Sequence, residues 1–147
     1  MTATNGIITL LTDYGTDDAY VAAMKGAILS RNPKAVIVDV THSVRPYAIL
    51  QGAFLFDSAW RGFPVGTVHV AVVDPGVGSE RRAVAFRAGD HFMVGPDNGL
   101  FTFLSEPISD LIELAIPPEA ARTFHGRDVF GPAALYSASP TKLAEAA

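Results

Sequence analysis

Three polar segments of this sequence each follow directly after a short apolar run. They are Thr12–Asp18, Thr41–Ser43 and Asp74–Gly78. If the apolar runs are parallel strands, their carboxyl ends meet at one edge of a sheet, where open α/β sheets bind ligands. A carboxylate at that edge can accept hydrogen bonds from both vicinal hydroxyls of a ribose, and Asp13 and Asp74 are both candidates. The alternative for each is an aspartate that caps the turn or helix after its strand.

Basic residues beyond the third polar segment could complete a reactive site. Arg81 and Arg82 follow it at once, and one of them can fold back over Asp74 as a charge partner while the other stays in solvent. His125 lies between an aromatic residue and a glycine, a setting in which an imidazole can be oriented for proton transfer. A solvated arginine pair and a bystander histidine are the alternatives.

The elements that must position these residues alternate between strands and helices. Ile7–Thr12, Val36–Val40 and Val68–Val73 are apolar and rich in β-branched residues, which is typical of strands buried on both faces. Ala19–Arg31 and Ile49–Trp60 lie between these runs and are predicted helices. The first 40 residues therefore predict a βαβ unit, whose crossover should be right-handed.

The second half of the sequence predicts a mixed sheet. Arg82–Ala88 and His91–Gly95 can pair as a hairpin, which adds an antiparallel strand. Asp110–Ala115 is a weaker strand candidate, and Val129–Tyr136 is a predicted short helix. The expected fold class is α/β, with a mixed but mostly parallel sheet flanked by helices in Rossmann-like layers. No repeat or linker divides the sequence, so residues 1–147 are expected to form a single domain.

Composition excludes several classes of function. The formal charge is -4, from 11 Lys and Arg against 15 Asp and Glu, which argues against nucleic acid as the main partner. The absence of cysteine excludes disulfides, thiolate nucleophiles and cysteine-based zinc sites. The sequence begins without the pattern of a secretory signal, and no apolar run reaches the ~20 residues of a membrane span. We therefore expect a cytoplasmic protein that binds a small molecule and no membrane.

Five segments together resemble one enzyme family. They are ITLLTDYGTDDAYVAAMKGAI, VDVTHSV, GTVHVAVVDPGVGSERRAV, GPDNGLFT and TFHGRDVFGPAA. In order and spacing they are similar to the S-adenosyl-L-methionine hydroxide adenosyltransferases. These enzymes are the adenosine-forming SAM hydrolases, relatives of the bacterial fluorinase and chlorinase. The similarity extends from about Gly6 to about Ala134.

The resemblance implies a reaction and a set of residues for it. Water or hydroxide would displace methionine from ribose C5′ of S-adenosyl-L-methionine, which is the substrate; no cofactor and no metal is expected. The implied catalytic residues are Asp74, Arg81 and His125, and the implied substrate-binding residues are Asp13, Tyr47, Asp74 and Thr123. Arg81 could stabilise hydroxide character, His125 could accept the proton and Asp74 could orient water and ribose, but the sequence leaves this division open.

The same family implies an assembly. Its members are longer, with a smaller β-rich C-terminal domain, and the substrate lies between two subunits of a trimer. This sequence corresponds to the N-terminal domain only, so the β-rich domain is expected to be absent from it. A homo-oligomer, a trimer by resemblance, is the expected state.

Two other functions are open from the residues. The aspartates at positions 13, 17 and 18 could ligate a hard cation, as in a metal-dependent nucleoside hydrolase. A truncated domain that binds a nucleoside or only oligomerises, without turnover, is the second alternative.

Overall fold

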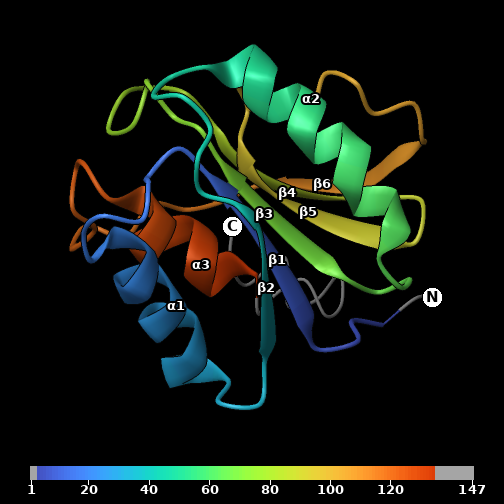
Figure 1. The fold of residues 1–147 in the computed structure, drawn as a ribbon, viewed down its shortest axis with the longest axis horizontal. Helices are drawn as coiled ribbons and strands as arrows, with labels where there is room; N and C mark the ends of the chain where they lie inside the picture. Colours follow the sequence, from blue (N-terminus) through green and yellow to red (C-terminus); the bar gives the residue numbers. More distant parts are fainter. Residues whose placement is uncertain (1–2, 135–147) are drawn as a thin grey trace.

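The computed structural model describes residues 3–134, which form three layers around one six-stranded sheet (Figure 1). The strands are β1 (Ile7–Thr12), β2 (Val36–Thr41), β3 (Val68–Val72), β4 (Ala83–Ala88), β5 (His91–Pro96) and β6 (Ile108–Glu113). The helices are α1 (Tyr20–Arg31), α2 (Ile49–Ala59), the 3₁₀ helix η1 (Trp60–Gly62), the π-helix η2 (Gly126–Phe130) and α3 (Gly131–Ala133). The expected α/β class is confirmed. No helix within residues 3–134 is long and apolar enough to cross a membrane.

The order of the strands creates a crevice between β1 and β3. The sheet runs β2-β1-β3-β5-β4-β6, with β1 parallel to β2 and β3, and β3 parallel to β5. The strand β4 is antiparallel to both of its neighbours, so the sheet is mixed as predicted. Helices α1 and α2 cover opposite faces of the sheet (Figure 1). The chain passes from β1 to β2 on one side of β1 and from β3 toward β4 on the other side of β3, so the connections diverge between these two strands. Open α/β sheets bind ligands at the carboxyl ends of strands at such a point.

Alternation along the buried strands builds a core on each face of the sheet. Val68, Val70 and Val72 of β3 pack with α1, η2 and α3, while Ala71 packs with α2 and Trp60 on the other face. Because successive residues of a strand point to opposite faces, a strand covered on both sides must be apolar throughout. This explains why β1 and β3 were recognisable from their sequence alone.

Three predicted elements differ from the structure. The strand β2 was expected to be buried on both faces, but it lies at an edge of the sheet and its residues are exposed or partly buried. The strand expected at Asp110–Ala115 lies at Ile108–Glu113 as the edge strand β6, which is mostly exposed and held by its pairing with β4. Asp110 has a positive φ of 53° and the β4–β6 register is irregular, so no clean alternation marks the strand. The helix expected at Val129–Tyr136 is wrong in type and start, because a π-helix at Gly126–Phe130 precedes a short α3. Its last residues, and the polar tail after them, lie outside the described residues.

Two histidines form a buried pair beneath α2 and η1, away from the crevice. Nδ1 of His69 lies 2.7 Å from Oγ1 of Thr9, and its Nε2 lies 3.0 Å from Nδ1 of His91. Trp60 packs against both imidazoles. Burial lowers the pKa of His69 to about 3, and burial also lowers the pKa of His91. Both rings are therefore neutral in the folded protein near pH 7.

This pair predicts a loss of stability in mild acid. The unfolded chain binds protons at histidine near pH 6.5, whereas the folded chain keeps these two neutral to lower pH. Their stabilisation is present above pH 6.5 and decreases as the pH falls from there toward the folded pKa values, by about 1.4 kcal/mol per pH unit for each histidine kept neutral. Urea unfolding between pH 6.5 and 4.5 measures the slope. In His69→Gln the slope should become shallower, and an unchanged slope would contradict this account.

Candidate active site

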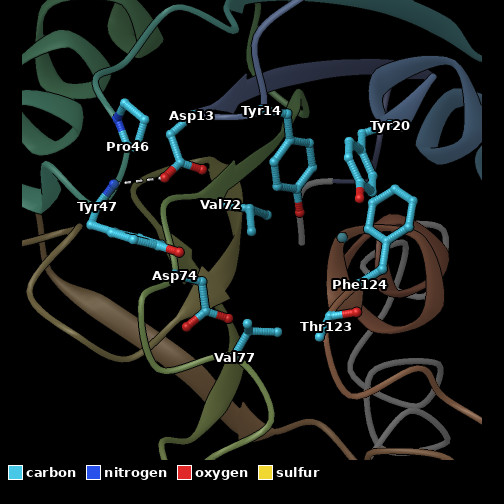
Figure 2. A pocket seen from close by; sticks show the side chains of 11 residues that line it. Asp13, Tyr14, Tyr20, Pro46, Tyr47, Val72, Asp74, Val77, Thr123 and Phe124 are labelled. Carbon is cyan, nitrogen blue, oxygen red and sulfur yellow. Dashed lines mark hydrogen bonds between the residues drawn. The ribbon is translucent and has the colours of Figure 1, made fainter. Parts of the chain in front are cut away.

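A cavity of about 230 Å³ opens at the crevice between β1 and β3. Its lining comes from the segments that follow β1, β2 and β3 and from the segment before η2: Asp13, Tyr14, Tyr20, Pro46, Tyr47, Val72, Asp74, Val77, Thr123, Phe124 and Gly126. Figure 2 shows Asp13, Tyr47 and Asp74 across the cavity from the aromatic rings of Tyr14, Tyr20 and Phe124. The four residues expected to bind substrate, Asp13, Tyr47, Asp74 and Thr123, all line this cavity.

Asp13 is hydrogen-bonded to the backbone of the segment that follows β2. One of its carboxylate oxygens, Oδ2, accepts a hydrogen bond of 2.9 Å from the backbone N–H of Tyr47 (Figure 2). Tyr47 has a positive φ of 65°, an uncommon conformation for a bulky residue that the surrounding structure must maintain. Burial raises the pKa of Asp13, the Tyr47 amide opposes this, and the nearby Asp74 carboxylate adds to the rise. The carboxylate also lines the cavity, where it can accept hydrogen bonds from a ligand.

Asp74, Arg81 and His125 form one connected, buried group. Nε of Arg81 donates to both carboxylate oxygens of Asp74 at 3.0 Å, and its Nη2 donates to Oδ2 as well. The same Nη2 lies 2.8 Å from Nδ1 of His125. The side chains of Asp74 and Arg81 are 4% and 9% exposed, and His125 is equally buried. Of the three, only Asp74 lines the cavity, while Arg81 and His125 lie behind it.

The contact with Arg81 determines which nitrogen of His125 carries the proton. A guanidinium only donates hydrogen bonds, so Nδ1 of the neutral imidazole must accept and Nε2 must carry the hydrogen. Burial lowers the pKa of His125, the charge of Arg81 lowers it further, and Asp74 and Asp128 oppose the change. In this arrangement His125 is a neutral donor at Nε2, and neither ring nitrogen has a free lone pair for a proton.

Arg81 and Arg82 have different surroundings. The sequence predicted that one of them would contact Asp74 and that the other would be exposed. Arg82 pairs with Asp97, and both side chains are about half exposed, at 55% and 44%. Arg81 also stacks its guanidinium on the ring of Phe130, with its Cζ 5.3 Å from the ring centroid. Among the described residues, Nη1 of Arg81 is buried and has no hydrogen-bond partner. A buried donor without an acceptor is a place where a ligand oxygen or a water can bind.

Sequence reasoning missed the aromatic wall of the cavity. Tyr14, Tyr20 and Phe124 form a cluster with ring centroids 5.0 to 6.2 Å apart. The hydroxyl of Tyr14 accepts a hydrogen bond from the backbone amide of Gly126. Two of these rings adjoin residues already selected, since Tyr14 follows Asp13 and Phe124 precedes His125. Adjacency to a strand-end aspartate and to the histidine was therefore the signal that could have identified them.

The structure places His42 and the proposed metal-binding aspartates differently from what the sequence suggested. His42 of the second polar segment is buried against Thr12 and does not line the cavity. Within the part of the chain that the structure describes, no cluster of three or more His, Asp or Glu side chains could hold a metal ion. The aspartates at positions 13, 17 and 18 therefore do not converge as the ligand set that a nucleoside hydrolase would need.

Together, the layered α/β fold and the cavity at its strand ends define an α/β domain with a ligand site at the carboxyl edge of its sheet and a buried Asp-Arg-His group beside it. Residues 8–147 match the model of the SAM hydroxide adenosyltransferase N-terminal domain. The chain belongs to this family, as the resemblance predicted.

Individual relatives agree with that assignment. The (R)-S-adenosyl-L-methionine hydrolase of Methanocaldococcus jannaschii is 45% identical in an alignment of 132 residues that covers 84% of this chain and 50% of that protein. A fluorinase from Actinoplanes sp. is 32% identical over 85% of this chain and 52% of its own. A crystal structure of an uncharacterised conserved protein from Thermotoga maritima superposes with a TM-score of 0.83 at 36% identity, covering 86% of this chain and 51% of that one. The chain thus spans about half the length of the curated relatives it matches.

Proposed function

We propose that this chain carries the nucleophile side of an active site that hydrolyses S-adenosyl-L-methionine to adenosine and L-methionine. The observation that carries the proposal is the buried Asp74–Arg81–His125 group beside a cavity lined by Asp13. Its chemistry matches the hydroxide adenosyl transfer named in the family's description. The relative from Methanocaldococcus jannaschii is named for the (R) form of the substrate, and we propose the same preference here.

The proposed step is an in-line displacement. An oxygen of water or hydroxide forms a bond to ribose C5′ as the C5′–S bond breaks and its electron pair returns to sulfur. Neutral methionine leaves, and one proton is released to solvent. Because a sulfonium is already a good leaving group, the protein mainly has to align the nucleophile and exclude other water. No metal and no cofactor enters this proposal.

The geometry supports a division of roles that the sequence left open. Asp13, whose carboxylate lines the cavity and is held by the Tyr47 amide, would bind the ribose hydroxyls. Arg81 would orient Asp74, the member of the group that lines the cavity, and its positive charge behind Asp74 would stabilise the hydroxide character of the attacking oxygen. His125 would orient Arg81 and remain neutral; this differs from a role as proton acceptor, since its Nδ1 already accepts from the guanidinium.

Several wider properties belong to the same proposal. We propose that residues 1–147 are one α/β domain and that a second, β-rich domain of a neighbouring subunit provides the other wall of the site in a homotrimer. Support comes from the half-length match to the relatives and from the half-exposed rings of Tyr20 and Tyr47 at the cavity. We also propose that the protein is cytoplasmic and binds neither nucleic acid nor membranes.

Isotope labelling tests the reaction directly. The protein is incubated in ¹⁸O-labelled water with the (R) and (S) sulfonium forms of S-adenosyl-L-methionine, and the products are followed by mass spectrometry. We expect ¹⁸O at the 5′-oxygen of adenosine, one methionine per adenosine, and faster turnover of the (R) form. Release of free adenine would instead indicate cleavage of the glycosidic bond. Adenosine binding without methionine release would favour the inactive binding domain.

A further inference from the structure

A second hydrogen-bonded chain lies beneath the Asp13 segment, outside the cavity. Nζ of Lys25 in α1 donates to Oδ2 of Asp39 at 2.8 Å, and Oδ1 of Asp39 lies 2.8 Å from Nε2 of His42. Nδ1 of His42 lies 2.7 Å from Oγ1 of Thr12, which in turn accepts the backbone N–H of Tyr14 at 3.2 Å. Thr12 is fully buried and His42 is 5% exposed. The chain therefore runs from the surface of α1 to the backbone directly after Asp13.

With His42 as a neutral imidazole, the hydrogens in this chain have one consistent arrangement. The carboxylate of Asp39 only accepts, so Nε2 of His42 must carry the hydrogen of the neutral ring. Its Nδ1 is then an acceptor, and the hydroxyl of Thr12 must donate to it. The Thr12 oxygen keeps its lone pairs for the amide of Tyr14. Burial raises the pKa of Asp39, but hydrogen bonds from Lys25 and His42 outweigh it and lower the pKa, which keeps the carboxylate ionised.

The contact between Asp39 and His42 lies where β2 departs from a regular strand. In a regular strand, residues three apart point to opposite faces of the sheet. The β1–β2 register shifts between Leu10 and Leu11, which pair with Asp39 and Thr41, and His42 lies in a bend directly after the strand. Such bulges commonly redirect side chains next to active sites.

His42 also connects the two segments that carry Asp13 and Tyr47. Its backbone oxygen accepts the N–H of Gly15 at 2.8 Å, so the segment after β1 is held to the end of β2 twice. Further along, the N–H of Tyr47 donates to Asp13. Loss of the His42 contacts would leave the Asp13 carboxylate on a less restrained turn.

We propose that His42 is a positioning residue that acts through Thr12: the Lys25–Asp39–His42–Thr12 chain holds the Tyr14 amide and thereby the Asp13 carboxylate at the cavity. The inference rests on the proposed function only for the role of Asp13 as a ribose ligand. The hydrogen-bond arrangement itself can be tested without any ligand.

The ligand-free test uses NMR on the whole chain. Long-range ¹⁵N–¹H correlations should show His42 protonated at Nε2 and unprotonated at Nδ1. The Tyr14 amide should exchange with solvent at least ~10-fold faster in Thr12→Val, which loses the hydroxyl, than in Thr12→Ser, which keeps it. Ser58→Ala, which removes a hydroxyl of α2 outside the cavity, is the control and should leave this rate unchanged. A proton on Nδ1, or equal exchange in the valine and serine variants, would overturn the proposal.

The functional test separates this inference from the proposed activity. With S-adenosyl-L-methionine as the probe, we expect Thr12→Val to raise KM about 10-fold with kcat within about two-fold. Thr12→Ser should restore KM, a rescue that general loss of stability would not produce. A KM unchanged in Thr12→Val overturns the positioning role. If the wild-type chain neither binds nor turns over this probe, the proposed function fails, and the NMR result alone still decides the hydrogen-bond chain.

Discussion

Asp74→Ala is expected to lower the proposed release of adenosine by about 10²-fold or more and to destabilise the fold by about 3–5 kcal/mol. Asp74 satisfies two nitrogens of the Arg81 guanidinium, and the ion pair is almost fully buried. Its removal leaves a buried positive charge whose remaining partners are a neutral imidazole and the ring of Phe130. An uncompensated buried charge is among the most destabilising outcomes of a single substitution.

The neighbouring arginine provides a matched control. Asp97→Ala removes the partner of Arg82 from an exposed pair, and such pairs contribute only about 0–1 kcal/mol. Asp74→Ala should therefore lower both the unfolding free energy, measured in urea, and the rate of methionine release much more than Asp97→Ala does. Equal effects of the two alanine variants would contradict the assignment of the buried pair.

A double substitution distinguishes stability from chemistry in the same pair. Asp74→Ala combined with Arg81→Met removes both charges, and apolar replacement of a whole buried ion pair is often neutral or stabilising. We expect most of the lost stability to return while the rate remains at least ~10²-fold below wild type. Recovery of the rate along with the stability would show that the pair is structural only. His125→Ala, which keeps the ion pair, should lower the rate by a similar factor.

Sequence reasoning was sufficient where one physical constraint dominates. The strands β1 and β3 must be apolar on both faces because helices cover both, so their limits were predicted to within a residue. Asp13 and Asp74 come just after these strands. Because parallel strands end at the same edge of the sheet, the two carboxylates were expected to lie near each other. The position of Arg81 and Arg82 just beyond the Asp74 segment predicted that one of them could fold back over Asp74 while the other stays in solvent. In the structure Arg81 is the buried one and Arg82 the exposed one.

The missed features depend on contacts that no short sequence window contains. The π-helix before α3 has no cap hydrogen bond from a side chain, and its wide turn is stabilised by packing of Val129 and Phe130 in the core. The Asp39–His42 contact joins a residue of β2 to the bend after it, beside an irregular β1–β2 register. Tyr14 follows β1 and Gly126 comes after β6 in the sequence, so their contact forms only in the folded protein. Local propensity cannot report such pairings, and the family resemblance identified the residues beside them without showing their geometry.

Gly126 is the residue at which a single added methyl group should most disturb the cavity. A Cβ built there would lie 2.1 Å from the hydroxyl oxygen of Tyr14 and 3.0 Å from its Cζ. The tyrosine ring lines the cavity, and His125 precedes the glycine, so either the ring or the start of η2 must move. We expect Gly126→Ala to destabilise the fold by about 1–3 kcal/mol, as overpacking does, and to weaken substrate binding with it.

Because the colliding atom is the hydroxyl oxygen of Tyr14, the effect of Tyr14→Phe on stability should change sign between the wild-type and Gly126→Ala backgrounds. In the wild-type chain, Tyr14→Phe removes the acceptor for the Gly126 amide and should be destabilising by about 1 kcal/mol. In the Gly126→Ala background the same substitution removes the colliding oxygen and should be stabilising, although recovery stays partial because the ring carbons remain close. Gly26→Ala, at an exposed helical glycine with no atom within 4 Å, should instead stabilise by about 0.5–1 kcal/mol. A double-mutant cycle on unfolding free energies measures the coupling, and additive effects of the two substitutions would contradict the collision as its cause.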